Sequence, residues 1–97
     1  MPTYVTLIHW TEQGIQNVKD TTKRLQEGLG LFEQMGIKLL NFYWTSGRYD
    51  GIAISEAADD ETASAATLAL SLQGNVRTET LRAYTGEDME RILAKMP

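Results

Sequence analysis

Residues 38–57 read KLLNFYWTSGRYDGIAISEA, and this stretch decides the fold. Residues 38–45 are rich in aromatic and aliphatic side chains, a composition typical of a β-strand, and residues 49–57 form a second strand-like run. The connection Ser46-Gly47-Arg48 is short and contains a glycine, which a tight turn favours. The sequence therefore predicts an antiparallel hairpin in the middle of the chain.

The segment before this hairpin predicts a strand and then a helical region. Residues 3–9 mix β-branched and aromatic side chains, as a buried strand does. Between Thr11 and Gly36, apolar residues recur at helical spacing; they are Ile15, Val18, Leu25, Leu29 and Phe32. Because Asp20 can cap a new helix, we expect a short helix followed by a longer one.

The segment after the hairpin predicts a helix, a strand and a last helix. Residues 61–73 are rich in alanine and leucine, Asp59 or Asp60 can cap them, and Gly74 suits a helix end. Residues 76–84 are β-prone. Thr85 and Asp88 resemble a capping box, and the helix they would start has an apolar face of Met89, Ile92, Leu93 and Met96.

The predicted order of elements is β-α-β-β-α-β-α, which indicates an α+β, ferredoxin-like fold with one helix appended. We expect residues 1–97 to form a single domain whose four-stranded antiparallel sheet has helices on one face and an open second face. Alternation predicts that Leu40, Phe42, Ile52 and Ile54 point to the helices. It assigns Asn41, Tyr43, Thr45, Tyr49, Ala53 and Ser55 to the open face, and it does not decide which side chains of 76–84 share that face.

Composition excludes several classes of function. The chain has 13 acidic and 9 basic residues among 97, and this balance disfavours nucleic acid or anionic lipid as a partner. It has no cysteine, so disulfides and thiolate metal sites are excluded. No stretch approaches the length of a membrane span, and we expect a cytoplasmic protein without a cofactor. An RNA-binding domain shares the order of elements but needs basic and aromatic strand motifs that residues 49–55 lack.

The stretch from Tyr43 to Asp50 resembles the signature of the GYD domain family, whose glycine, tyrosine and aspartate correspond to Gly47, Tyr49 and Asp50. Residues 13–21 and 74–80 are also similar to that family, so the resemblance covers nearly the whole chain. It implies a bacterial or archaeal protein of the dimeric α/β-barrel group, in which two open sheets pack face to face. The family has no established activity, whereas the wider group includes monooxygenases, isomerases, haem-dependent enzymes and stress proteins.

Three side chains are candidates for catalysis. Tyr49 and Asp50 could orient and protonate a small polar substrate, although adjacent strand residues point to opposite faces. The structural alternative is that Gly47 permits the turn, Asp50 accepts hydrogen bonds from the backbone or from Arg48, and Tyr49 fills the interface. His9, the only histidine, could be a general base at the end of the first strand. Without a second histidine, metal binding is disfavoured.

Ligand contacts are expected from residues of the hairpin and of the last strand, namely Tyr43, Thr45, Tyr49, Arg77 and Thr78. Arg77 could hold an anionic group, or could make cross-strand ion pairs instead. Two functions follow. The first is a homodimer or higher oligomer that binds a small molecule or has a structural role through its open sheet face. The alternative is a cofactor-free enzyme of the monooxygenase or isomerase kind, with His9, Tyr49 and Asp50 as acid, base and orienting groups.

Overall fold

The computed structural model describes residues 1–97 and contains every predicted element. The elements are β1 (Thr3–Trp10), α1 (Glu12–Gln16), the 3-10 turn η1 (Val18–Asp20), α2 (Thr21–Gln34), β2 (Lys38–Trp44), β3 (Gly51–Glu56), α3 (Asp60–Leu72), β4 (Val76–Ala83) and α4 (Gly86–Ala94). The predicted helix break near Asp20 is confirmed, because η1 separates α1 from α2 there, but the Asp20 side chain makes no capping bond to α2. No helix is long and apolar enough to cross a membrane.

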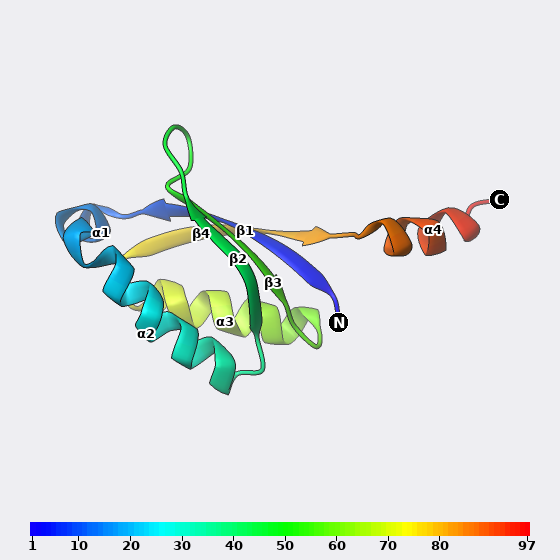
Figure 1. Ribbon diagram of the computed structural model, residues 1–97, viewed down its shortest axis with the longest axis horizontal. Helices are drawn as coiled ribbons and strands as arrows, with labels where there is room; N and C mark the ends of the chain where they lie inside the picture. The colour runs from blue at the N-terminus through cyan, green and yellow to red at the C-terminus, as the bar shows by residue number, and fades with distance from the viewer.

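The four strands form one antiparallel sheet in the order β2-β3-β1-β4. The helices α2 and α3 lie on one side of this sheet, as Figure 1 shows. The predicted ferredoxin-like α+β arrangement is therefore confirmed. The loop between β2 and β3 projects on the opposite side of the sheet, away from α2 and α3 (Figure 1).

The core lies between the sheet and the two main helices. Tyr4 of β1 is 4% exposed. It packs in a cluster with Ile37, with Ala57 directly after β3, and with Ala63 and Ala66 of α3. The Tyr4 hydroxyl donates a hydrogen bond of 2.5 Å to Oδ1 of Asp60 at the start of α3. This bond and burial of the ring join the first strand to α3.

The alternation prediction was wrong for β3. Ala53 is the Cα partner of Thr6, which is buried beneath the helices, whereas Ile54 is the partner of Val5. Ala53 and Ser55 therefore face the helices, and Ile52 and Ile54 point to the open side. The prediction failed because it placed the larger aliphatic side chains inward, while the helix side of β3 has only small residues.

The same prediction holds for most of β2 but not at its start. Phe42 faces the helices and Tyr43 faces away from them, because their partners across the ladder are Ala53 and Ile52. A register shift between Leu39 and Asn41 changes which residues of β2 point to the helices. Leu39 lies on the helix side, and Leu40 has no partner across the ladder. Leu40, expected in the core, is 41% exposed.

The pairing of β1 with β4 settles the orientation of the last strand. Four residues of β4 pair with the side of β1 that faces the helices, so their side chains lie on the helix side of the sheet. They are Val76, Thr78, Thr80 and Arg82, opposite Trp10, Ile8, Thr6 and Tyr4. The opposite side, which we call the open face, includes Val5 and Leu7 of β1, Ile52 and Ile54 of β3, Leu81 of β4 and Tyr43 of β2. Its centre is therefore aliphatic and not half polar as expected.

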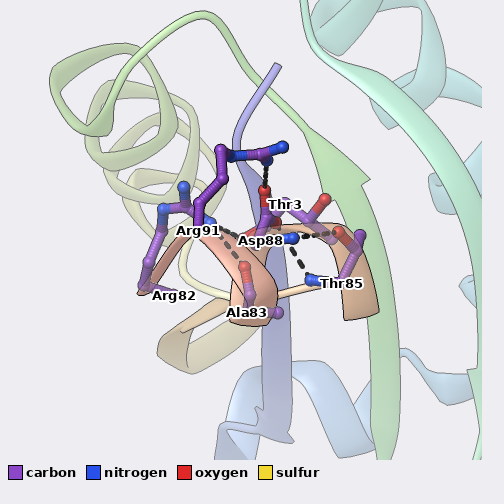
Figure 2. A network of polar contacts seen from close by, with 6 residues as sticks. All are labelled: Thr3, Arg82, Ala83, Thr85, Asp88 and Arg91. Atoms are coloured by element: carbon purple, nitrogen blue, oxygen red, sulfur yellow. Dashed lines mark hydrogen bonds and ion pairs between the residues drawn. The ribbon is translucent and has the colours of Figure 1, made fainter. Parts of the chain in front are cut away.

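The last helix extends beyond the sheet and away from the rest of the chain (Figure 1). Its predicted capping box is confirmed: the Thr85 backbone N–H donates to Asp88 Oδ2 at 2.9 Å, and the Asp88 N–H donates to Thr85 Oγ1 at 3.1 Å. Figure 2 shows this cap with the Arg91–Asp88 ion pair and with Arg82, which donates to the carbonyls of Thr3 and Ala83. Hydrogen bonds from Thr85 hold the pKa of Asp88 below its usual value.

Candidate functional site

The hairpin loop between β2 and β3 is locked onto the end of β1. Gly47 adopts a φ of 109°, a conformation that favours glycine. The Thr45 hydroxyl donates to the Tyr49 carbonyl at 2.6 Å, which closes the loop on itself. The Asp50 N–H donates to the Ile8 carbonyl at 2.8 Å, and Asp50 Oδ2 accepts the Trp10 N–H at 2.9 Å. Asp50 therefore joins the loop to β1 on both sides of His9.

This attachment places Tyr49 over His9 on the open side of the sheet. The two ring centroids are 4.8 Å apart, and the planes are tilted by 50°. The Tyr49 hydroxyl donates a long hydrogen bond of 3.4 Å to Glu79 Oε2 of β4. Glu79 Oε1 lies 3.7 Å from His9 Nε2. His9, Tyr49 and Glu79 together form what we call the His9 cluster.

The His9 cluster combines an imidazole, a phenol and a carboxylate near solvent. The side chains of His9 and Glu79 are 33% and 57% exposed, so a small molecule or a partner protein can reach both. A positive charge lies on either side, because Arg77 is the cross-strand partner of His9 and the Arg48 guanidinium lies 5.7 Å from the centre of the Tyr49 ring. Chemically, the arrangement can bind a polar group and transfer a proton to or from it.

The structure brings together only some of the predicted catalytic residues. His9 and Tyr49 are in contact, but the Asp50 carboxylate is bonded to the Trp10 backbone and takes no part in the cluster. The acidic member is Glu79, which the sequence prediction did not assign to the site. The alternation of residues 76–84 places Glu79 on the same face as Arg77 and Leu81. That pattern alone does not determine whether this face is the one that carries His9.

The predicted ligand contacts are divided between the two sides of the sheet. Tyr43 and Arg77 are exposed on the open side, and Thr45 lies in the hairpin loop. Thr78 pairs with the buried Ile8 and lies on the helix side, so the structure separates it from Tyr43 and Arg77. No group of three or more histidine, aspartate or glutamate side chains is arranged to hold a metal ion.

A second attachment joins Thr11, directly after β1, to the turn before β4. The Thr11 N–H donates to the Asn75 carbonyl at 3.1 Å, and its hydroxyl caps α1 and donates to the Gly74 carbonyl at 2.5 Å. Gly14 is buried here, and a Cβ at this position would lie 2.0 Å from the Asn75 carbonyl oxygen. Gln13 Nε2 adds bonds to Gln73 and Asn75 at 3.1 and 3.0 Å. Any side chain at residue 14 would separate the two segments.

The three segments that resemble the family, residues 13–21, 43–50 and 74–80, each take part in these attachments. The GYD domain model matches residues 4–93. This chain belongs to the GYD domain family. In this GYD protein the glycine at 47 permits the turn, the tyrosine at 49 covers His9, and the aspartate at 50 holds the loop to β1.

A relative of this GYD protein from Thermus thermophilus is 31% identical over 90 residues, which cover 92% of this chain and 95% of the relative. Its name is "Glutamine synthetase and cystathionine beta-lyase binding protein". No solved structure matches the chain significantly.

Proposed function

We propose that this chain is a single-domain protein-binding module that acts as a homodimer. The observation that carries the proposal is the aliphatic centre of the open face, where Val5, Leu7, Ile52, Ile54 and Leu81 are brought together by three adjacent strands. A sheet face that meets water is mainly polar, whereas one that meets another protein layer is apolar. The open face is therefore suited to a second protein surface.

A second copy of the chain is the occupant we propose for the open face. If the open faces of two copies pack against each other, each copy buries the same aliphatic patch, as a two-fold interface requires. The resemblance to the dimeric α/β-barrel group, in which two sheets close a barrel, supports this choice. The His9 cluster would then lie at the rim of the interface.

We propose that α4 contacts the protein partner. Its apolar residues Met89, Ile92 and Leu93 recur at helical spacing and are 41%, 38% and 54% exposed, and Met96, just after the helix, is 64% exposed. A helix of nine residues is marginal on its own in water, and amphipathic helices with methionine adapt to grooves of other proteins. The name of the relative supports glutamine synthetase and cystathionine beta-lyase as partners to test.

The dimer is tested by sedimentation velocity of Leu7→Glu and Leu81→Glu, with Leu68→Glu as control. Leu68 lies in α3 and is 70% exposed, so the same substitution there leaves the open face unchanged. We expect a dimer for the wild type and the control, and a monomer for both open-face variants. A wild-type monomer, or dimers in both variants, would contradict the proposed interface.

Partner binding is tested with purified glutamine synthetase and cystathionine beta-lyase of the source organism. Ile92→Glu should weaken binding at least tenfold while the protein stays dimeric, and Glu90→Gln on the polar side of α4 should bind like the wild type. If neither enzyme binds the wild type, or if Ile92→Glu binds normally, α4 is not the contact surface for these partners.

The His9 cluster favours a second candidate function, a cofactor-free monooxygenase or isomerase acting on a small apolar or phenolic molecule. An accessible imidazole with a nearby proton partner can act in acid–base catalysis, and Glu79 Oε1 lies 3.7 Å from His9 Nε2. The test is oxygen consumption and product formation with a panel of phenols and hydroquinones, for the wild type and for His9→Gln. Turnover that disappears in His9→Gln would support catalysis, and no turnover in either protein would reject the monooxygenase reading.

A further inference from the structure

A cavity lies between the sheet and the helices α2 and α3, on the side away from the His9 cluster. Its volume is about 110 Å³. The sheet contributes aromatic walls from Trp10, Phe42 and Trp44, and the helices contribute Leu25, Phe32 and Leu70. Phe42 and Trp44 pack edge to face with ring centroids 4.9 Å apart. The space is therefore surrounded mainly by aromatic and aliphatic side chains.

Two pairs of polar side chains in the wall of this cavity bond to each other. Thr6 Oγ1 and Thr80 Oγ1 are 3.5 Å apart, and the Trp44 indole N–H donates to Thr21 Oγ1 at 3.1 Å. No buried side-chain nitrogen or oxygen lacks a hydrogen-bond partner. A water molecule is stable in a cavity when several unpaired polar groups hold it, and no buried side chain here has an unpaired nitrogen or oxygen. Apolar molecules gain most from entering such a space.

Small residues keep the cavity open from both layers. Ala53 of β3 and Ala66 of α3 both line it and are 8% and 4% exposed. Gly28 of α2 lines it as well. Larger side chains at these positions would fill the volume and add apolar contacts, which normally stabilises a protein core. The cavity therefore depends on particular small residues in β3, α2 and α3.

We propose that this cavity is a binding site for a compact apolar molecule no larger than a single six-membered ring. The size limit follows from the volume, because a cavity of about 150 Å³ accommodates benzene and this one is about 110 Å³. The chemical class follows from the aromatic and aliphatic walls. The site is separate from the open face and from α4, so it does not depend on the proposed dimer or protein partner.

Benzene and xenon are the probes for the test, which is a titration followed by ¹H–¹⁵N NMR. The chain has two tryptophans, Trp10 and Trp44, and both line the cavity, so their indole N–H signals report on it. We expect saturable shifts of both signals with each probe. Signals that do not move with either probe would overturn the proposal.

Two pairs of variants locate the binding. Ala53→Leu should abolish the shifts, whereas Ile54→Leu, which changes the next residue on the opposite face, should keep them. If Ala53→Leu does not fold, Ala66→Val provides the same test from α3, with the exposed Ala65→Val as its control. Binding must weaken at least tenfold in a filled variant and remain unchanged in its control. Equal binding in a folded filled variant and its control would place the probe elsewhere and overturn the proposal.

Discussion

The ring of Tyr49 lies 4.8 Å from the ring of His9, although the two residues belong to a loop and a strand that are separated by 40 positions of sequence. Asp50, the residue after Tyr49, makes this contact possible because it bonds to the backbone on both sides of His9. The position of the only histidine is thus coupled to the conformation of the hairpin loop.

Replacing Tyr49 should therefore loosen the loop. Tyr49→Ala removes a ring pair whose usual contribution is about 0.5–1.5 kcal/mol, and we expect a loss of that size in urea unfolding. Tyr49→Phe retains the ring and should lose little, because the hydroxyl makes only a long bond to Glu79. Tyr43→Ala is the control, since Tyr43 is 56% exposed. A loss in Tyr43→Ala as large as in Tyr49→Ala would refute the specific role of the His9 contact.

Asp50→Ala should destabilise the chain more than Tyr49→Phe does. It removes a charge-assisted bond to the Trp10 N–H, and such bonds contribute about 1.5–3 kcal/mol. Amide hydrogen exchange at Trp10 should accelerate. Asp20→Ala is the matched control, because Asp20 precedes α2 without a side-chain capping bond. Unchanged exchange at Trp10 in Asp50→Ala would contradict this role.

Gly14→Ala and Gly28→Ala should have opposite effects on stability. The new methyl group at residue 14 would meet the Asn75 carbonyl oxygen at 2.0 Å, so the attachment of α1 to residues 73–75 must break. At residue 28, within α2, nothing lies within 4 Å, and glycine-to-alanine changes in helices stabilise by roughly 0.5–1 kcal/mol. Thermal unfolding measures both, and a stable Gly14→Ala protein would disprove the close contact.

The unfolding free energy should fall at high pH because of Tyr4. Burial and the hydrogen bond to Asp60 raise the pKa of Tyr4 from 10.0 to about 12. The folded state favours the neutral phenol, so the contribution is fully present below pH 10 and is lost as the pH rises toward 12. Urea unfolding at pH 9 to 12 measures the loss. Tyr4→Phe should lack this part of the pH dependence, and an identical slope in both proteins would contradict the assignment.

Most of the fold could be predicted from sequence because local signals agree with it. The capping box of Thr85 and Asp88, the turn at Gly47 and the break at Asp20 are each determined by neighbouring residues. The orientation of Ile52 and Ile54 could not be predicted, because alternation separates the faces only when one of them is polar. Over residues 51–55 of β3 the helix side carries Gly51, Ala53 and Ser55 and the open side carries Ile52 and Ile54, so neither face of this run is marked by a charged side chain.

The candidate site was predictable only in part. His9 and Tyr49 were found from their chemistry, but Glu79 joins them through the register of β1 with β4, which no local pattern determines. Asp50 was predicted as catalytic from its position beside Tyr49. Its backbone bond to Trp10 requires knowledge of where the hairpin meets β1. The cavity beneath the sheet also depends on tertiary packing and has no sequence signal.

The strand order β2-β3-β1-β4 also determines when the chain can finish folding. On the ribosome, β1, β2 and β3 can pair as soon as residues 3–56 have emerged, with β1 still exposed along one edge. That edge is covered only after β4 is synthesised, because Trp10 pairs with Val76 and Thr3 pairs with Ala83. Until then the nascent sheet presents unpaired backbone groups, which are a template for aggregation. Delaying synthesis of β4 should therefore increase aggregation even though the mature protein is unchanged.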